Sequence, residues 1–240
     1  MRLIDTHFHL DFYREHRYWY DQINAMKQYT LCVTNSPEIY CACKKIYSET
    51  RYVKFALGYN PQVCSEMVLS RQAFLSELAK AKYIGEVGLD FSPKHIGTKI
   101  KQVDAFEFIC RSVAGSSKLL TVHSRNAEKD VFDIMARNEI KRAIIHWYTG
   151  DLENMQKFIR AGYYFSVNPN MCATSKGKRI ISEIPLDKIL VESDGPFTKA
   201  GTHKYSPANL QDIYSILATT IGVQDIENIV YKNFNRLLTL

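Results

Sequence analysis

The sequence of 240 residues lacks several features that would assign it to a class of protein at once. No apolar run reaches the ~18 residues that a membrane span requires. His7 and His9 stand where a secretory leader would have its apolar centre, so we expect no leader and a cytoplasmic protein that does not enter membranes. The six cysteines form no C-x-x-C pair and show no framework spacing, which favours reduced thiols packed as small apolar side chains.

Repeats, low-complexity segments and linkers rich in proline or glycine are also missing, so residues 1–240 are predicted to form a single domain. Hydrophobic residues make up 46% of the chain and charged residues 23%, as in ordinary globular proteins. The formal net charge of +6 is compatible with a polyanionic partner, but many domains without one carry a similar charge. Charge alone therefore leaves the partner open.

What is present is a recurring alternation of short β-branched runs with segments of helical spacing. The predicted strands cover residues 2–5, 29–35, 52–58, 82–89, 118–124, 142–147, 163–168 and 188–194. Eight strands that alternate with helices favour a parallel sheet, and eight is the number that closes a (β/α)8 barrel. A doubly wound open sheet would carry a glycine-rich phosphate turn after its first strand, where this chain has "DTHFHLD". The sequence therefore predicts an α/β protein with a TIM barrel fold.

Side chains suited to metal binding follow five of the predicted strands. Asp5, His7 and His9 follow the first strand, and the fourth, fifth, sixth and eighth strands end with Glu86, His123, His146 and Asp194, respectively. A single histidine at a strand end is often only a hydrogen-bonded core residue. In a barrel, however, these strand ends gather around one mouth, where active sites are built. Taken together, the residues predict a metal site.

The number of candidates exceeds the three protein ligands of a single catalytic zinc ion, and a shared carboxylate suits two divalent cations. We expect His7, His9 and Asp194 on one cation, His123 and His146 on the other, and Glu86 between them. Such mixed nitrogen and oxygen ligands accept Mn²⁺ or Zn²⁺, and Mg²⁺ could serve with phosphate oxygens of a substrate.

Hydrolysis is the reaction that such a centre predicts. A bound divalent cation lowers the pKa of water to about 7 and so provides a nucleophile at neutral pH. We expect Asp194 to orient or deprotonate that water, with Glu86 as the second catalytic carboxylate. Asp5 is expected behind the metal ligands, accepting a proton from a ligand histidine.

Five motifs in order resemble those of the TatD family of metal-dependent deoxyribonucleases, a branch of the amidohydrolase superfamily. They are "DTHFHLD", "IGEVGLD", "VHSRNA", "IHWYTG" and "ESDGPF". The resemblance implies a TIM barrel with a two-metal centre that cleaves DNA, often from the 3′ end of single strands. It implies His7, His9, Glu86, His123, His146 and Asp194 as metal ligands, and Arg125 as a phosphate contact. The family usually has G-x-H-P after its third strand, whereas this chain has "GYNP" with Asn60.

Further substrate contacts are expected around the mouth. Asn60 could hydrogen-bond a phosphate oxygen, although it cannot act as an acid. Trp147 and Tyr148 could stack on unpaired bases, but aromatic residues beside strand ends more often cap the barrel core. The long polar loop at residues 195–207 is suited to binding a substrate. His95 stands on a polar stretch away from any strand end and is interpreted as a surface residue.

Several motifs are most similar to those of the TatD-like nuclease subunit of Qat antiphage defence systems, which implies a bacterial origin and partner subunits. Three functions stay open: a metal-dependent DNase, a hydrolase of a small amide, ester or phosphotriester, and a defence-complex subunit that is active only when assembled. Relatives of the second kind commonly use a carboxylated lysine at the end of the fourth strand. Glu86 at this position argues against that alternative.

Overall fold

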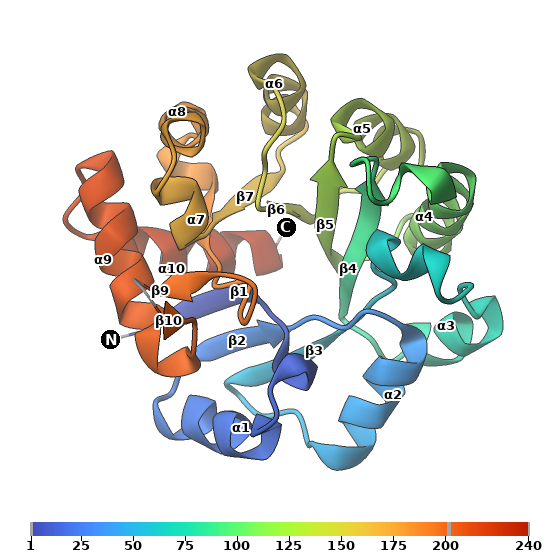
Figure 1. Cartoon of the computed structure of the whole chain (residues 1–240), viewed down its shortest axis with the longest axis horizontal. Coiled ribbons are helices and arrows are strands. Elements are labelled where there is room, and N and C mark those ends of the chain that lie inside the picture. Colours follow the sequence, from blue (N-terminus) through green and yellow to red (C-terminus); the bar gives the residue numbers. More distant parts are fainter. Residues whose placement is uncertain (1, 201–202, 240) are drawn as a thin grey trace.

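The computed structural model describes residues 2–200 and 203–239. Eight strands lie in one sheet in chain order, and each is parallel to the next. They are β1 (Ile4–Phe8), β2 (Tyr29–Cys32), β3 (Val53–Leu57), β4 (Tyr83–Asp90), β5 (Leu119–Arg125), β6 (Ala143–His146), β7 (Tyr164–Val167) and β8 (Ile189–Val191). The Thr6 hydroxyl of β1 donates to the carbonyl of Val191 in β8 at 2.9 Å. The sheet thus curls into a nearly closed barrel, which confirms the predicted fold (Figure 1).

An outer layer of helices surrounds these strands (Figure 1). The helices are α1 (His16–Ala25), α2 (Pro37–Ile46), α3 (Arg71–Leu78), α4 (Lys99–Val113), α5 (Glu128–Arg137), α6 (Leu152–Arg160), α7 (Pro169–Cys172), α8 (Ser175–Glu183), α9 (Leu210–Ile221) and α10 (Ile226–Thr239). Several begin at side-chain caps, as where Asp151 accepts from the backbone N–H of Asn154 at the start of α6. Within the described residues, no helix combines the length and apolar character that crossing a bilayer requires.

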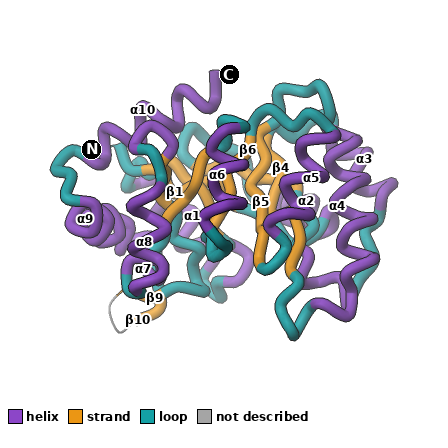
Figure 2. Tube along the Cα trace, turned by 90° about the horizontal axis from the view of Figure 1, so that it is seen from above, coloured by secondary structure: helices purple, strands orange, loops and turns teal. Residues whose placement is uncertain are grey.

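The main hydrophobic core joins apolar residues of the strands to those of the surrounding helices, and all six cysteines are free thiols, as expected. Two further short strands, β9 (Lys199–Ala200) and β10 (His203–Lys204), pair antiparallel within the predicted loop 195–207, of which residues 201 and 202 lie outside the described part. This hairpin lies at the end of the barrel opposite the C-terminus of α10 (Figure 2). It therefore belongs to the rim where the strands end.

An irregularity in β4 prepares the site. The pairing between β4 and β5 shifts register between Ile84 and Val87, on either side of Glu86. Such irregularities re-aim side chains and are common beside active sites. The backbone N–H of Glu86 donates to the carbonyl of Thr34 at 3.1 Å, which ties this segment to the end of β2.

Gly58, directly after β3, packs against the same segment and permits a first prediction. A Cβ at this position would overlap the carbonyl oxygen of Thr34 and lie 2.7 Å from the backbone nitrogen of Glu86. Because neither backbone can retreat, Gly58→Ala is expected to lower the free energy of unfolding by about 3 kcal/mol. Urea denaturation followed by circular dichroism measures this change. Gly97→Ala is the control, because a Cβ there meets nothing within 4 Å, and equal stability of the two variants would contradict the prediction.

Candidate metal centre

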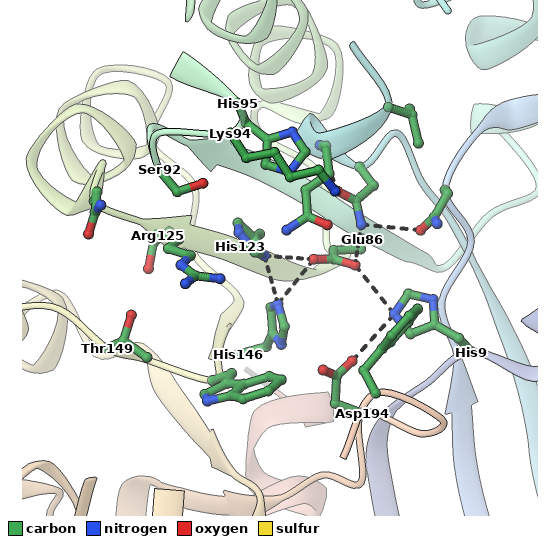
Figure 3. Close-up of a pocket in the computed structure, with 18 of the residues that line it drawn as sticks. His9, Glu86, Ser92, Lys94, His95, His123, Arg125, His146, Thr149 and Asp194 are labelled. Carbon is green, nitrogen blue, oxygen red and sulfur yellow. Dashed lines mark hydrogen bonds and ion pairs between the residues drawn. The ribbon is translucent and has the colours of Figure 1, made fainter. Parts of the chain in front are cut away.

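The predicted ligands converge at the carboxyl ends of the strands. His7 lies in β1, Glu86 in β4, His123 in β5 and His146 in β6, while His9 directly follows β1 and Asp194 lies in the loop after β8. Figure 3 shows most of them around Glu86, in a pocket of about 800 Å³. Six side chains distant in sequence thus form one cluster, as the strand pattern predicted.

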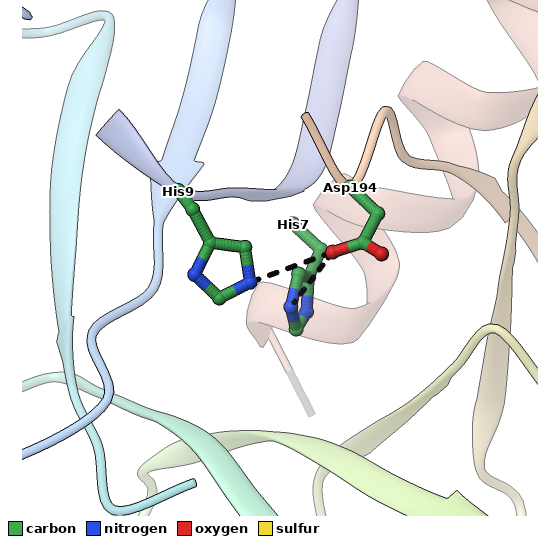
Figure 4. A group of neighbouring side chains, drawn as sticks. All are labelled: His7, His9 and Asp194. Carbon is green, nitrogen blue, oxygen red and sulfur yellow. Dashed lines mark ion pairs between the residues drawn. The ribbon is translucent and has the colours of Figure 1, made fainter. Parts of the chain in front are cut away.

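One group of possible ligands consists of His7, His9 and Asp194 (Figure 4). The Oδ1 atom of Asp194 lies 3.4 Å from His9 Nε2 and 3.7 Å from His7 Nε2. A tetrahedral zinc ion with bonds of about 2.0–2.1 Å holds neighbouring ligand atoms about 3.3 Å apart. The observed separations therefore fit a shared cation.

Asp194 is held in place by its backbone. Its N–H donates to the carbonyl of His7 at 2.9 Å, which links the end of β8 to β1. Its φ of 49° lies in the left-handed region, which non-glycine residues rarely adopt. Such backbone is retained where the surrounding structure enforces it, as it often does at functional sites.

A second group consists of Glu86, His123 and His146. Glu86 Oε1 lies 2.8 Å from His123 Nδ1 and 3.1 Å from His146 Nε2. The other carboxylate oxygen, Oε2, lies 3.5 Å from His7 Nε2 and 3.4 Å from His9 Nε2. One oxygen of Glu86 thus faces each group, so that a cation held by either group would meet a carboxylate oxygen of Glu86.

Burial and charge show that the cluster suits cations. His7 Nε2 is fully buried and, among the described residues, has no hydrogen-bond partner. Burial alone would raise the pKa of Glu86, but His146 and His123 hold it well below its usual value. Burial likewise disfavours a charged His9, yet the carboxylates of Asp194 and Glu86 raise its pKa to about 10. The site therefore favours positive charge at its centre, which divalent cations would supply.

Three side chains behind the cluster orient the histidine rings. Thr121 Oγ1 lies 2.8 Å from His7 Nδ1, Asp90 Oδ2 lies 3.1 Å from His123 Nε2, and Glu192 Oε1 lies 3.6 Å from His146 Nδ1. The sequence prediction missed all three roles. Asp90 stands four residues after Glu86, and Glu192 stands two residues before Asp194, each in a motif already noted. A strand periodicity of two could therefore have indicated both residues.

Asp90 offers the second prediction. It also accepts hydrogen bonds from the Ser92 N–H at 2.9 Å and the Gln62 amide at 2.8 Å. Burial opposes ionisation, but His123 and Ser92 lower the pKa of Asp90. Asp90→Asn is expected to weaken metal binding about 10–100-fold, because the carboxylate behind a ligand histidine fixes that ring. Calorimetric titration with Mn²⁺ measures the affinity.

The control for this variant is Asp104→Asn. Asp104 is an exposed residue of α4 whose carboxylate pairs with Arg71 at 2.6 Å. Neither residue belongs to the ligand cluster. An Asp90→Asn protein that binds Mn²⁺ as tightly as Asp104→Asn would show that Asp90 does not position His123.

Asp5 is hydrogen-bonded to backbone groups rather than to the ring of a ligand histidine. Its Oδ1 atom accepts from the backbone N–H groups of Ser193 at 2.9 Å and His7 at 3.2 Å, and no described histidine ring contacts it. The prediction that it accepts a proton from a ligand histidine is therefore wrong. Burial raises the pKa of Asp5 to about 7, partly offset by these donors. Asp5 instead joins the end of β8 to β1 and so places Asp194 beside His7.

Three predicted substrate contacts reach the pocket wall. Arg125, at the end of β5, and the half-buried Trp147 both line it. Asn60 lines it as well, but its amide donates to Glu86 Oε2 at 2.6 Å and its carbonyl accepts from the Gln62 N–H. The amide of Asn60 is thus occupied by Glu86, so that it supports this carboxylate rather than facing a phosphate.

Tyr148 contradicts its predicted role. The residue is fully buried, its hydroxyl donates to the Asp151 carbonyl, and its ring packs edge-on against Phe158 and Phe165. A ring enclosed in this way cannot stack on a base. The reason is the positive φ of Trp147, 39°, which turns the chain so that the next side chain enters the core.

The pocket has walls that the sequence did not predict. Lys94 and His95, from the loop after β4, line it together with Lys176 at the start of α8. His95, interpreted from the sequence only as a surface residue, is partly exposed and belongs to the pocket wall. Phe12 and Phe197 line the pocket next to His9. None of these residues ends a strand, so the strand pattern carried no signal for them.

Comparison with known proteins gives a consistent picture. The model of a family described as TatD related DNase matches residues 4–239. An uncharacterized metal-dependent hydrolase of Buchnera aphidicola is 28% identical over all of this chain and 97% of its own length. The deoxyribonuclease TATDN3 of Homo sapiens is 29% identical over 47% of this chain and 42% of its own length. The match to the putative deoxyribonuclease TATDN3 of Mus musculus spans 54% of that protein. The crystal structure of YjjV, a TatD homologue from Escherichia coli, superposes with a TM-score of 0.84 at 18% identity, over 99% of this chain and 98% of that one.

Proposed function

Because this chain belongs to the TatD-related DNase family of metal-dependent hydrolases, we propose that it cleaves phosphodiester bonds of DNA at the centre built around Glu86. The observation that carries the proposal is the Glu86 carboxylate, which faces His7 and His9 with one oxygen and His123 and His146 with the other. Two divalent cations, Mg²⁺, Mn²⁺ or Zn²⁺, are the cofactors that we assign to the two groups. When bound, they supply a nucleophilic water at neutral pH and neutralise charge on the phosphoryl group.

The protein's own side chains provide proton transfer and phosphate binding. Asp194 borders both the first ligand group and the pocket, where its carboxylate can orient a water and accept its proton. Arg125 and Lys94 line the other parts of the pocket with exposed positive charge, which suits phosphate oxygens. In Figure 3, Arg125 and Lys94 lie away from His9, on the far side of Glu86. A phosphodiester would thus be held between cationic groups and the ligand cluster.

We further propose that the substrate is the end of a single strand. A pocket of about 800 Å³ has room for a few nucleotides rather than a duplex. Digestion from the 3′ end follows from the family resemblance.

Glu86 also stands where many amide and phosphotriester hydrolases of the superfamily use a modified lysine, which favours the nuclease over those activities.

Cleavage of end-labelled oligonucleotides tests the proposal. The purified chain is incubated with Mn²⁺ and a single-stranded or a blunt duplex substrate, each labelled at the 5′ end, with EDTA in parallel. A ladder that shortens from the 3′ end of the single strand, absent with EDTA, is expected. Cleavage that persists in EDTA would overturn the proposed metal-dependent activity of the isolated chain. So would the absence of phosphodiester cleavage by protein that has metal bound.

The narrower resemblance to the nuclease subunit of Qat defence systems stays a proposal, with partner subunits as its consequence. It is supported by short sequence motifs and by the departure at Asn60. An isolated chain that binds metal in stoichiometric amounts but cuts no DNA would favour a partner-dependent subunit. Efficient cleavage by the isolated chain would remove the need for partners in catalysis.

A further inference from the structure

Two large apolar side chains lie exposed beside the metal centre. Phe12 ends the short 3-10 helix Leu10–Phe12 after β1, and Phe197 lies in the loop between β8 and β9. They are 48% and 51% exposed, and their ring centroids are 5.1 Å apart at an interplanar angle of 68°. The centroid of the His9 ring lies 5.5 Å from Phe12 and 5.2 Å from Phe197. The two rings therefore form one aromatic pair on the pocket wall.

The backbone couples this pair to the ligands of the first group. Phe12 N–H donates to the carbonyl of His9 at 3.3 Å, and Phe197 N–H donates to the carbonyl of Asp194 at 2.8 Å. Each phenylalanine thus stands three residues after a ligand, in a turn closed by that ligand's own carbonyl. The distance between the rings and the reaction centre is consequently fixed by local structure rather than by a long flexible loop.

The rest of the pocket differs in chemistry from this pair. Arg125, Lys94 and Lys176 give it exposed positive charge. A ligand that matches both parts is anionic at one end and flat and apolar at the other, which describes a nucleotide. Aromatic side chains stack on bases of any sequence, because every base has a π-face. An extended protein segment would match the aromatic pair, but only one that also carried carboxylates would match the cations.

We propose that the Phe12–Phe197 pair takes the nucleobase next to the phosphodiester that is cut. This inference rests on the proposed nuclease function and specifies its substrate. A base paired and stacked within a duplex cannot reach the pair, so the enzyme requires a base that is free of its neighbours. The pair thereby selects single-stranded or frayed ends.

Oligonucleotides with and without terminal bases test the inference. One substrate is a single-stranded oligonucleotide, and the other carries abasic residues at its last two 3′ positions. For the wild-type protein with Mn²⁺, we expect kcat/KM to be about tenfold higher or more on the substrate that has its terminal bases than on the abasic substrate. In Phe12→Ala/Phe197→Ala, this ratio is expected to fall to about one, with the loss confined to the substrate with bases.

Graded variants separate stacking from mere apolar bulk. Phe197→Leu keeps an apolar side chain without a flat ring and is expected to lose most of the preference for bases, whereas Phe197→Trp retains it. Tyr18→Ala is the matched control, because Tyr18 is an aromatic residue of α1, 54% exposed, that does not line the pocket. Variants that slow both substrates equally would overturn the inference and leave the pair a structural cover for His9.

Binding without catalysis separates this inference from the proposed function. A single strand with 2-aminopurine at its 3′ end is titrated with the protein in Ca²⁺, and its fluorescence reports stacking. A change of fluorescence that the double variant abolishes supports the aromatic site even if no phosphodiester is cleaved. Binding that is equal for wild type and double variant overturns the site, whatever the nuclease assay shows.

Discussion

Replacement of Glu86 by glutamine is expected to lower kcat for DNA cleavage by about 10³-fold or more, the equivalent of several kcal/mol of transition-state stabilisation by metal ions. Glu86 contacts both ligand groups through separate oxygens, Oε1 and Oε2. The amide keeps the shape of the side chain, but one of its two ends becomes an N–H donor that cannot ligate a cation. The number of bound Mn²⁺ ions is therefore expected to fall with the activity, as measured by elemental analysis of the dialysed protein.

Glu66→Gln is the matched control for this experiment. Glu66 is an exposed carboxylate of the same pocket that contributes no described contact to the ligand cluster. This variant is expected to keep both wild-type kcat and metal content. An active Glu86→Gln enzyme with its full metal content would show that the two ligand groups do not depend on a shared carboxylate.

Asp194→Asn is expected to lower kcat by about 10²–10⁴-fold, since a general base contributes that much. Asparagine tolerates left-handed backbone, so the φ of 49° at this position is preserved and the comparison isolates the charge. The cation of the second group is expected to remain, because the ion pairs of Asp194 within the described structure are with His7 and His9 of the first group. KM for the oligonucleotide should change far less than kcat.

Steady-state kinetics with the labelled oligonucleotide provides both constants. Asp187→Asn serves as the control, because Asp187 is an exposed carboxylate that pairs with Arg236 at 3.5 Å outside the pocket. A loss that lies mainly in KM would assign Asp194 to substrate binding rather than to proton transfer.

The fold and most of the cluster followed from one regularity of the sequence. The strands are short, largely buried runs, and polar residues at or near the ends of several of them mark the mouth of the barrel. His123 and His146 could be assigned in this way because β5 and β6 end at or just beyond them. Asp194 could be assigned because it follows the buried apolar run that forms β8.

Other parts of the site depend on geometry that no local pattern encodes. The burial of Tyr148 follows from the left-handed backbone of Trp147, a single dihedral angle that the sequence does not reveal. Asp5 was assigned to a ligand histidine, but it accepts a hydrogen bond from the backbone N–H of Ser193, 188 residues away in the chain. Phe12 and Phe197 meet only because the barrel brings its first and last strands together. Contacts across the closure of a barrel are set by the whole fold.

Cleavage assays report on the centre indirectly, whereas diffraction can locate its ions. Crystals grown with Mn²⁺ and measured at the manganese absorption edge yield an anomalous difference map. Two peaks are expected, one among His7, His9, Asp194 and Glu86 and the other among Glu86, His123 and His146. A map with no peak at these side chains, or with a single peak that leaves one of the two groups without metal at saturating Mn²⁺, would contradict a two-cation centre bridged by Glu86.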